Sequence, residues 1–327
     1  MRVRFAVSLA LVVSVLSGAS SDAKAWGRRG HSIICQTAAA VLAVNTPDHK
    51  GDFLKKHSFD LGLYCNTPDL VWKKPATYKI EHPQHFMDLE IFTRAFKAAG
   101  VKGSDEFKLS RLEFERKYPA IEPEAGRSYW RITELTESLS TTAQNLKVVT
   151  QASDARATLQ ESWLVTAGAI GHYIGDLSQP LHASENYDGV LTNQKGVHAF
   201  FEDTVVDELS SSKRPASLEA AVGLAAMNAW KSYHKKAASL SILEISESLG
   251  DSSAKILPTL LALDKKIGRS NLKVAAAAHE TLIRERLVLS GLALAEIWSR
   301  HLDWTYDGNK FFNFNGAPDF VYPPGSR

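Results

Sequence analysis

Helical periodicity is the feature of this sequence that most restricts its fold. Across residues 155–177 (ARATLQESWLVTAGAIGHYIGDL), apolar side chains from Leu159 to Ile174 recur at spacings of three and four. This spacing places them on one face of an α-helix, and Pro180 predicts where that helix ends. Helical patterns also occur at residues 128–147, 217–240 and 271–302. We find no convincing set of segments in which apolar and polar residues alternate as in strands. We therefore expect an all-α fold, a single-domain multi-helix bundle.

Two segments interrupt the helical pattern. Residues 66–92 carry three Pro, two Asp and one Asn, and residues 183–196 carry two Asn, two Gly and one Asp. These residue types are typical of loops. We therefore expect long loops near one end of the bundle. No Pro/Gly/Ser linker and no internal repeat divides residues 26–327, which we interpret as one domain.

Residues 1–25 have the pattern of a secretory signal peptide. Arg2 and Arg4 precede the apolar run FAVSLALVVSVLSG, and the small-residue motif AKA ends the segment at residues 23–25. The run is shorter than the roughly 18 residues expected of a membrane span. We expect cleavage directly before Trp26 and export of the protein, which would be secreted or periplasmic.

The charge of the remaining chain is balanced. The whole sequence has 38 Lys and Arg and 36 Asp and Glu residues, and three of the basic and one of the acidic residues lie within residues 1–25. Bulk charge therefore does not indicate attachment to nucleic acid or to a membrane. The two cysteines, Cys35 and Cys65, are permitted to pair in an exported protein. At this point a buried pair of free thiols remains an equal alternative.

The segment GHYIGDLSQPLH, residues 171–182, is the strongest candidate for chemistry. His172 and Asp176 are four residues apart and share one helix face. His182 follows the break at Pro180, where the chain can turn back toward the same place. Taken alone, a His and an Asp at this spacing form an ion pair more often than a metal site.

Other histidine and acid pairs favour metal binding. In VHAFFED, His198 and Glu202 have the same spacing on another predicted helix, and EHPQHFMD adds His82, His85 and Asp88 in a loop. Imidazole nitrogens with carboxylate oxygens are the ligands that zinc prefers in hydrolytic sites. Several such pairs in one exported helical chain suggest more than one metal ion.

The order of these motifs resembles the S1/P1 nuclease family. The chain has Trp-Gly-x-x-Gly-His after the predicted cleavage site, then an Asp, His-Phe-x-Asp, Gly-His-x-x-Gly-Asp-x-x-Gln-Pro-x-His and His-x-x-x-acid. The family shares a superfamily with bacterial zinc-dependent phospholipases C. The motifs extend from Trp26 to Glu202, and the resemblance implies an α-helical fold that binds three zinc ions.

The resemblance also implies which residues bind each ion. The first ion would be bound by the α-amino group and carbonyl of Trp26 and by His31. The second would be bound by Asp69, His85 and His172, and Asp176 would bridge the first and second ions. The third ion would be bound by His182, His198 and Glu202.

The implied mechanism is hydrolysis of a phosphodiester without a protein nucleophile. Two zinc ions would share and activate a water, and the third would neutralise charge that develops in the transition state. Asp69 is the carboxylate expected to orient the attacking water as well as bind metal. If His31 and Asp69 both reach the cluster, then Cys35 and Cys65 come close enough to bridge, which favours a disulfide.

Two features favour a nuclease over a phospholipase. The spacing from Trp26 to His31 is that of the nucleases. Phe86 and Asp88 match nuclease positions that stack on a base and hydrogen-bond to it, an arrangement suited to single-stranded nucleic acid. The alternative is that Phe86 belongs to the core and Asp88 supports His85.

Three departures count against a nuclease, and the second of them is more similar to a phospholipase C. Glu202 stands where S1/P1 nucleases usually have Asp, and the short segment ASENYDGVLTNQKG replaces an expected Gly-Gly-Asn segment. The family's phosphate-positioning Arg is replaced by Trp72, with Lys73 and Lys74 beside it as possible substitutes.

We therefore expect a monomeric, secreted zinc endonuclease that acts on single-stranded DNA and RNA and leaves 5′-phosphates. A zinc-dependent phospholipase C that releases phospholipid headgroups is the main alternative, and a non-enzymatic zinc-stabilised binding protein is a third. No stable protein partner is implied.

Overall fold

The computed structural model describes residues 26–46, 50–151, 153–212, 214, 217–306 and 318–326. Within these ranges the chain forms fourteen α-helices with short 3-10 and π-helical turns, and no strand. The one β-type contact in the described chain is an isolated bridge between Met87 and Gly126. The predicted all-α class is confirmed. The predicted signal peptide, residues 1–25, lies outside the described residues.

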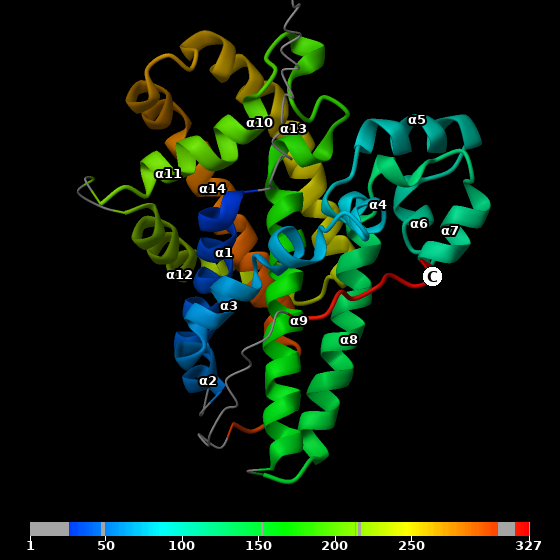
Figure 1. Cartoon of the computed structure of the whole chain (residues 1–327), viewed down its shortest axis with the longest axis vertical. Helices are drawn as coiled ribbons and strands as arrows, with labels where there is room; N and C mark the ends of the chain where they lie inside the picture. The colour runs from blue at the N-terminus through cyan, green and yellow to red at the C-terminus, as the bar shows by residue number, and fades with distance from the viewer. Residues whose placement is uncertain are drawn as a thin grey trace, which may run out of the picture.

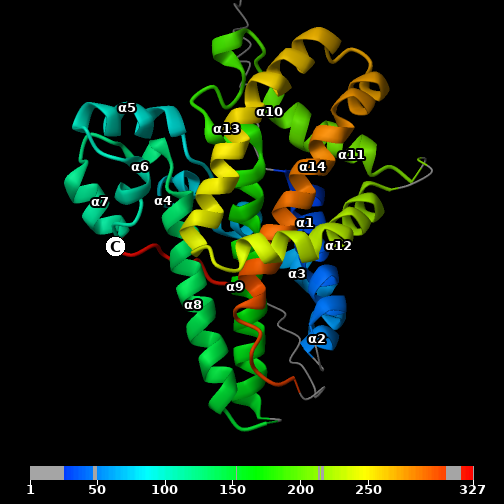
Figure 2. The same cartoon turned by 180° about the vertical axis from the view of Figure 1, so that it is seen from behind.

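Six long helices form the framework of the molecule. In Figure 1, α8 and α9 run side by side along the long axis, and α1, α13 and α14 lie around the upper half of α9. Seen from behind in Figure 2, α12 crosses beside α14. Their bounds are α1 Gly27–Asn45, α8 Ser128–Val148, α9 Asp154–Ser178, α12 Leu218–Ala237, α13 Ile242–Ile267 and α14 Leu272–Ser299.

The four helices predicted from periodicity are confirmed within three residues at each end, whereas α13 was not predicted. The first turn of α13 is fixed by a capping box, in which Ser241 and Glu244 satisfy each other's backbone N–H groups. Its middle holds Gly250, four serines from position 246 to position 253, and Pro258. These residues dilute the apolar pattern and usually indicate a helix break. Packing against α14 and α9 stabilises the helix despite them.

The remaining elements are short, and several lie where a loop was predicted. Residues 66–92 contain short helices, so the prediction of a plain loop was wrong there. Pro68 and Pro83 each stand in the first turn of one of these helices, where a missing N–H costs nothing. In contrast, residues 183–196 are turns with one 3-10 segment, as predicted.

The short elements are α2 Lys50–Lys56, α3 Ser58–Tyr64, the π-helix Pro68–Trp72, α4 Tyr78–Glu81, the 3-10 helix His82–His85, α5 Leu89–Ala99, α6 Gly103–Glu106, α7 Arg111–Lys117, the 3-10 helices Pro123–Ala125, Pro180–Ala183 and Val190–Thr192, α10 Val197–Ala199, the π-helix Phe200–Thr204 and α11 Val205–Leu209.

Two glycines of α9 allow α1 to approach it closely. A Cβ atom on Gly171 would lie 2.2 Å from the Cys35 sulfur, and one on Gly175 would lie 3.0 Å from Nδ1 of His31. Any larger residue at Gly171 would push the helices apart. The close approach brings His31 against the face of α9 that carries His172 and Asp176. None of the described helices has both the length and the apolar character needed to cross a membrane.

Candidate metal centre

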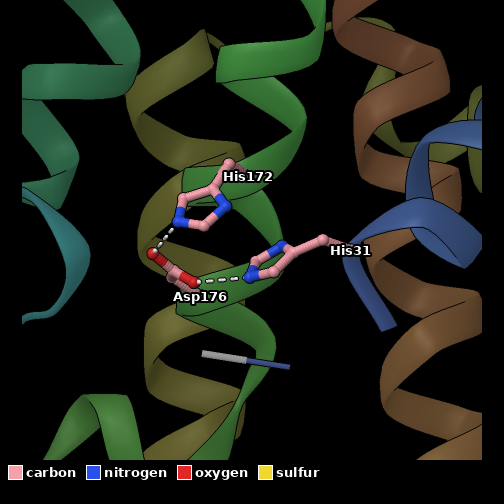
Figure 3. A group of neighbouring side chains, drawn as sticks. All are labelled: His31, His172 and Asp176. Carbon is pink, nitrogen blue, oxygen red and sulfur yellow. Dashed lines mark ion pairs between the residues drawn. The ribbon is translucent and has the colours of Figure 1, made fainter. Parts of the chain in front are cut away.

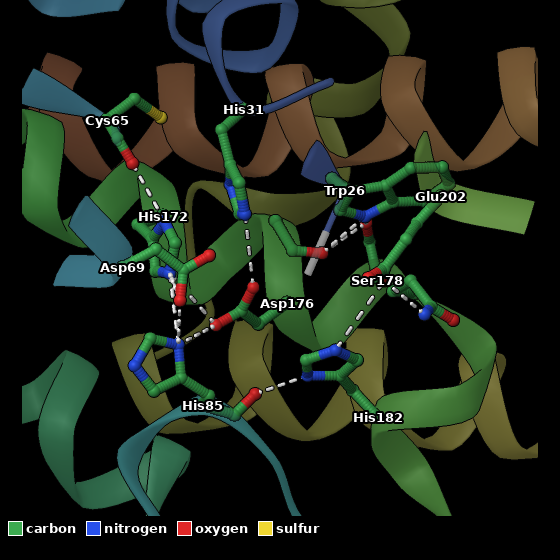
Figure 4. Close-up of polar contacts among 12 residues, drawn as sticks. Trp26, His31, Cys65, Asp69, His85, His172, Asp176, Ser178, His182 and Glu202 are labelled. Atoms are coloured by element: carbon green, nitrogen blue, oxygen red, sulfur yellow. Dashed lines mark hydrogen bonds and ion pairs between the residues drawn. The ribbon is translucent and has the colours of Figure 1, made fainter. Parts of the chain in front are cut away.

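Three groups of histidines and carboxylates in the described chain could each hold a metal ion. In each group the potential ligand atoms lie within 4.8 Å of one another, and the second group shares His172 with the first. Figure 3 draws the first group, and Figure 4 adds Asp69, His85, His182 and Glu202. The groups are His31, His172 and Asp176; Asp69, His85 and His172; and His182, His198 and Glu202.

Asp176 lies at the centre of the first two groups. Its Oδ1 is 3.4 Å from Nε2 of His31, and its Oδ2 is 3.0 Å from Nδ1 of His85. The same Oδ2 is 3.5 Å from Nε2 of His172. One carboxylate thus faces imidazoles from α1, α9 and the 3-10 helix at residues 82–85, as Figure 4 shows. The bridging role that the family resemblance implied for Asp176 stays a prediction.

The second group opens toward Asp69 on the π-helix at residues 68–72. Oδ1 of Asp69 is 3.8 Å from Nδ1 of His85 and 3.9 Å from Nε2 of His172. Those two ring nitrogens are 3.0 Å apart. Asp69 is less buried than the histidines, so it stands at the outer edge of the group.

The third group contains Glu202, which belongs to a second π-helix. Oε2 of Glu202 is 2.8 Å from Nε2 of His198 and 3.9 Å from Nε2 of His182. The next residue, Asp203, is turned away from this group and packs against Gly27. Gln179, which sequence reasoning missed, donates from Nε2 to Oε2 of Glu202 over 2.8 Å. Its place directly before Pro180 within the Gln-Pro-x-His motif was the available signal.

Backbone carbonyls fix the orientation of two of these imidazoles. Nδ1 of His172 donates to the carbonyl of Cys65 over 2.8 Å, and Nδ1 of His182 donates to the carbonyl of His85 over 2.7 Å. With the proton on Nδ1, the lone pair of each ring is on Nε2, which faces the group. Histidines that bind metals in proteins are commonly held in this way.

His85 is held from the opposite side by a buried carboxylate. Nε2 of His85 is 3.3 Å from Oε1 of Glu81, so Nδ1 is the nitrogen that faces Asp176. Glu81 also accepts a hydrogen bond from the Tyr173 hydroxyl and lies 3.7 Å from Nη2 of Arg131. Sequence reasoning missed these three supporting residues. The spacing of four between Glu81 and His85 was the one signal that pointed to them.

The electrostatics of the site favour a bound cation. Burial lowers the pKa of His172 to about 3 and raises the pKa of Glu202 to about 7. Burial, with the charge of Asp69 close by, raises the pKa of Asp176 well above its usual range. The site thus combines neutral imidazoles with carboxylates whose charge is costly to bury alone. A cation removes that cost, and the nitrogen and oxygen donors fit zinc.

Trp26 lies directly before α1 with its side chain fully buried. Its indole Nε1 donates to the carbonyl of Gly175 over 2.7 Å and contacts Oγ of Ser178 at 3.1 Å. The backbone conformation and the close packing around Trp26 explain why the Trp-Gly-x-x-Gly-His motif has glycine at positions 27 and 30. Gly27 has a left-handed φ of 50°, and a Cβ atom on Gly30 would lie 2.8 Å from Cβ of Trp26.

The disulfide between Cys35 and Cys65 is confirmed. It joins α1 to the residue that follows α3, and both cysteines are fully buried. Because the Cys65 carbonyl orients His172, the bridge supports the site directly.

The predicted substrate-binding residues lie at and beside the groups. Nζ of Lys73 is 3.4 Å from Oδ1 of Asp69. Burial lowers the pKa of Lys73, but Asp69 and Asp176 outweigh it and the net shift is upward. The partly buried Phe86 meets His82 edge to face at 5.2 Å. Burial raises the pKa of Asp88 to about 7, and Glu90 and Glu185 add to the shift.

Trp72 replaces the family's phosphate-positioning arginine but does not face the groups. It is buried, its Nε1 donates to the carbonyl of Pro318 over 3.2 Å, and the Arg131 guanidinium lies 5.5 Å from its ring centre. Among the residues considered as substitutes, Lys73 is the cation that the structure places beside Asp69.

Comparison with known proteins agrees with this geometry. The family model described as S1/P1 Nuclease matches residues 26–303. A probable serine protease from Bradyrhizobium tropiciagri is 24% identical over 269 residues, a match that covers 58% of this chain and 32% of that protein. The chain therefore spans about a third of the length of this curated relative.

Proposed function

The chain belongs to the S1/P1 nuclease family, and we propose that it is a secreted phosphodiesterase with three zinc ions. Its substrates would be single-stranded DNA and RNA, and its products would carry 5′-phosphates. The observation that supports this most strongly is the presence of three groups of imidazoles and carboxylates, two of which contact Asp176. The Cys35–Cys65 disulfide supports export, because such bonds persist in oxidising compartments.

Each group would hold one ion. The first ion would be bound by His31, by Asp176 and, once the chain begins at Trp26, by the α-amino group and carbonyl of that residue. The second ion would be bound by Asp69, His85, His172 and Asp176. The third ion would be bound by His182, His198 and Glu202. Bound zinc would activate a water as the nucleophile and stabilise the negative charge that develops on the phosphate.

Two residues of the second group would act on the substrate. The Asp69 carboxylate, at the outer edge of the group, would orient the water and accept its proton. The Lys73 ammonium would attract the phosphate, since its raised pKa keeps it charged at neutral pH. A fixed cation beside the reacting phosphate stabilises the charge of the transition state.

Phe86 and Asp88 would bind a base. The Phe86 ring is partly exposed and offers a face for stacking. The Asp88 carboxylate has no hydrogen-bond partner in the described part of the chain. It also lies among other acids, which repel a phosphate and favour the amino group of a base.

One observation favours phospholipase C activity as the second candidate. The turn at residues 183–196 carries three exposed apolar side chains, Tyr187, Val190 and Leu191. The Tyr187 ring is 6.3 Å from the ring of His198 in the third group. Exposed apolar residues beside a site suit contact with a lipid surface.

A side-by-side assay separates the two candidates. Zinc-loaded protein that begins at Trp26 is incubated with heat-denatured DNA and with phosphatidylcholine vesicles, alongside an Asp69→Asn variant and a Lys231→Ala surface control. We expect 5′-phosphorylated fragments from DNA, loss of cleavage with a chelator and its recovery with zinc. We also expect three zinc ions per chain by elemental analysis. Release of phosphocholine without DNA cleavage would assign the second function.

We also propose that the enzyme works as a monomer without a stable protein partner. Size-exclusion chromatography with light scattering measures this directly. A dimer that retains activity would contradict the proposal.

A further inference from the structure

An open apolar groove lies between α12, α13 and α14, the three helices at the front in Figure 2. Its volume is about 910 Å³, within the size range of small-molecule sites. Leu224 comes from α12, Ile256 from α13, and Leu289 and Leu292 from α14. None of the residues that line the groove belongs to the three candidate metal groups.

A buried arginine, Arg286, forms part of the groove wall. Only 6% of its surface is exposed. Nε donates to the carbonyl of Ser178 over 2.7 Å, and Nη2 donates to Oγ of Ser253 over 2.8 Å and to Oγ of Ser252 over 3.0 Å. Nη1 has no hydrogen-bond partner among the described residues, yet it is not sealed from solvent. This nitrogen is therefore available to a molecule in the groove.

The charge of Arg286 is balanced only in part, by the electrostatic attraction of the neighbouring Glu285. Within the described chain, no Asp or Glu forms an ion pair with it. Burial lowers the pKa of the guanidinium to about 10, so the group remains a cation at neutral pH. A buried charge without a counter-ion is costly, and a bound anion would remove that cost.

The rim of the groove adds to the positive charge. Lys255 and Arg284 are exposed lining residues, and neither forms an ion pair in the described structure. Glu285 is the one acidic residue among those that line the groove. The groove thus combines an apolar surface with a net positive charge, which is complementary to a molecule with an apolar chain and an anionic head.

We propose that this groove binds a long-chain fatty acid anion. Its carboxylate accepts a hydrogen bond from Nη1 of Arg286, and its acyl chain lies along Leu224, Ile256 and Leu289. Charge-assisted hydrogen bonds from arginine to a carboxylate are among the strong ones. The proposal is independent of the zinc chemistry, because it uses no candidate metal ligand.

Displacement of a fluorescent fatty acid tests the proposal. The zinc-loaded protein is titrated with cis-parinarate, which is then displaced by palmitate or by hexadecanol, an uncharged molecule with the same chain length. We expect saturable binding of one equivalent, and palmitate should bind at least tenfold more tightly than hexadecanol. Absence of saturable binding, or equal affinity for the two competitors, would overturn the proposal.

Three variants locate the ligand. Ala225→Trp should fill the groove and abolish binding, and the double variant Lys255→Glu/Arg284→Glu should weaken palmitate binding at least threefold. Lys231→Glu, on α12 but outside the groove, should leave binding unchanged. These variants spare Arg286, whose replacement by Met would also remove its four supporting hydrogen bonds. Any of three results would contradict the proposal. These are unchanged fatty acid binding by Ala225→Trp, displacement of cis-parinarate by a denatured DNA oligonucleotide, and a dimer that buries the groove.

Discussion

Removal of the Cys35–Cys65 disulfide should lower both stability and metal affinity. The bridge closes a loop with a sequence separation of 30 residues. In the chain-entropy model, a loop of this length restricts the unfolded chain by about 3.6 kcal/mol at 25 °C. This is a large part of the roughly 5–15 kcal/mol that stabilises a typical domain. Replacing both cysteines by alanine also leaves a small void, because both are fully buried, and the void adds to the loss.

The effect on metal affinity follows from one hydrogen bond. The Cys65 carbonyl accepts from Nδ1 of His172 over 2.8 Å, and this bond aims Nε2 of His172 at the cluster. Without the bridge, Cys65 is held less firmly and His172 gains rotational freedom. Loss of such a supporting bond commonly lowers metal affinity by roughly ten- to a hundredfold. We expect at least a tenfold loss.

Urea unfolding followed by tryptophan fluorescence measures the stability term. The oxidised protein, the reduced protein and the Cys35→Ala/Cys65→Ala variant are compared with zinc removed by a chelator, so that metal binding does not contribute. The reduced protein is the matched control, since it lacks the bridge but creates no void. A loss of less than about 1 kcal/mol on reduction would refute the loop-closure reasoning. Unchanged zinc affinity would refute the connection from Cys65 to His172.

Four further predictions concern single positions. Asp69→Asn should abolish turnover while circular dichroism and most bound zinc are retained, and full activity would remove Asp69 from its role. Glu202→Ala should lose one zinc and Asp203→Ala none by elemental analysis, and the reverse result would reassign the third group. A protein with one residue before Trp26 should bind less zinc, melt at a lower temperature and hydrolyse little substrate. If an extended form, verified as uncut by mass spectrometry, were as active as the protein that begins at Trp26, the terminal amine would be excluded as a ligand. Because burial raises the folded-state pKa of Asp88 to about 7, the folded protein keeps a proton that the unfolded chain releases near pH 4. Stability should therefore fall as pH rises from about 4 to 7, and Asp88→Asn should be more stable than the parent at pH 8, by at most about 4 kcal/mol. Equal stability of the two proteins at pH 8 would contradict the shift.

Much of the framework could be predicted from the sequence because its longest helices are periodic. The helix at residues 154–178 has apolar residues at regular spacing and a proline two residues after its end, so both its face and its end were predicted. Helix α13 was missed because Gly250, its serines and Pro258 weaken the local signal. Its stability comes from tertiary packing, which a local pattern does not contain.

The same distinction applies to the site. The ordered motifs were sufficient to identify His31, His172 and Asp176 as neighbours, since the family resemblance supplied the long-range contacts. The residues that hold the candidate ligands were not predictable in this way. Arg131 lies within α8, donates to the carbonyl of Val321 over 2.6 Å and approaches Glu81. The sequence separation between these partners carries no periodic signal, and only the folded chain brings them together.

Folding of this chain should depend on the cation that its centre is built to accept. Close contact at Gly171 and Gly175 brings α1 onto α9, and this contact buries Asp176 completely. Burial alone would favour a protonated Asp176, as its raised pKa indicates. A metal ion at the cluster would reverse that preference, because it would replace the proton and be bound by the imidazoles at the same time. The packing that stabilises the helices thus creates an electrostatic cost at one carboxylate, and metal binding would convert this cost into folding free energy.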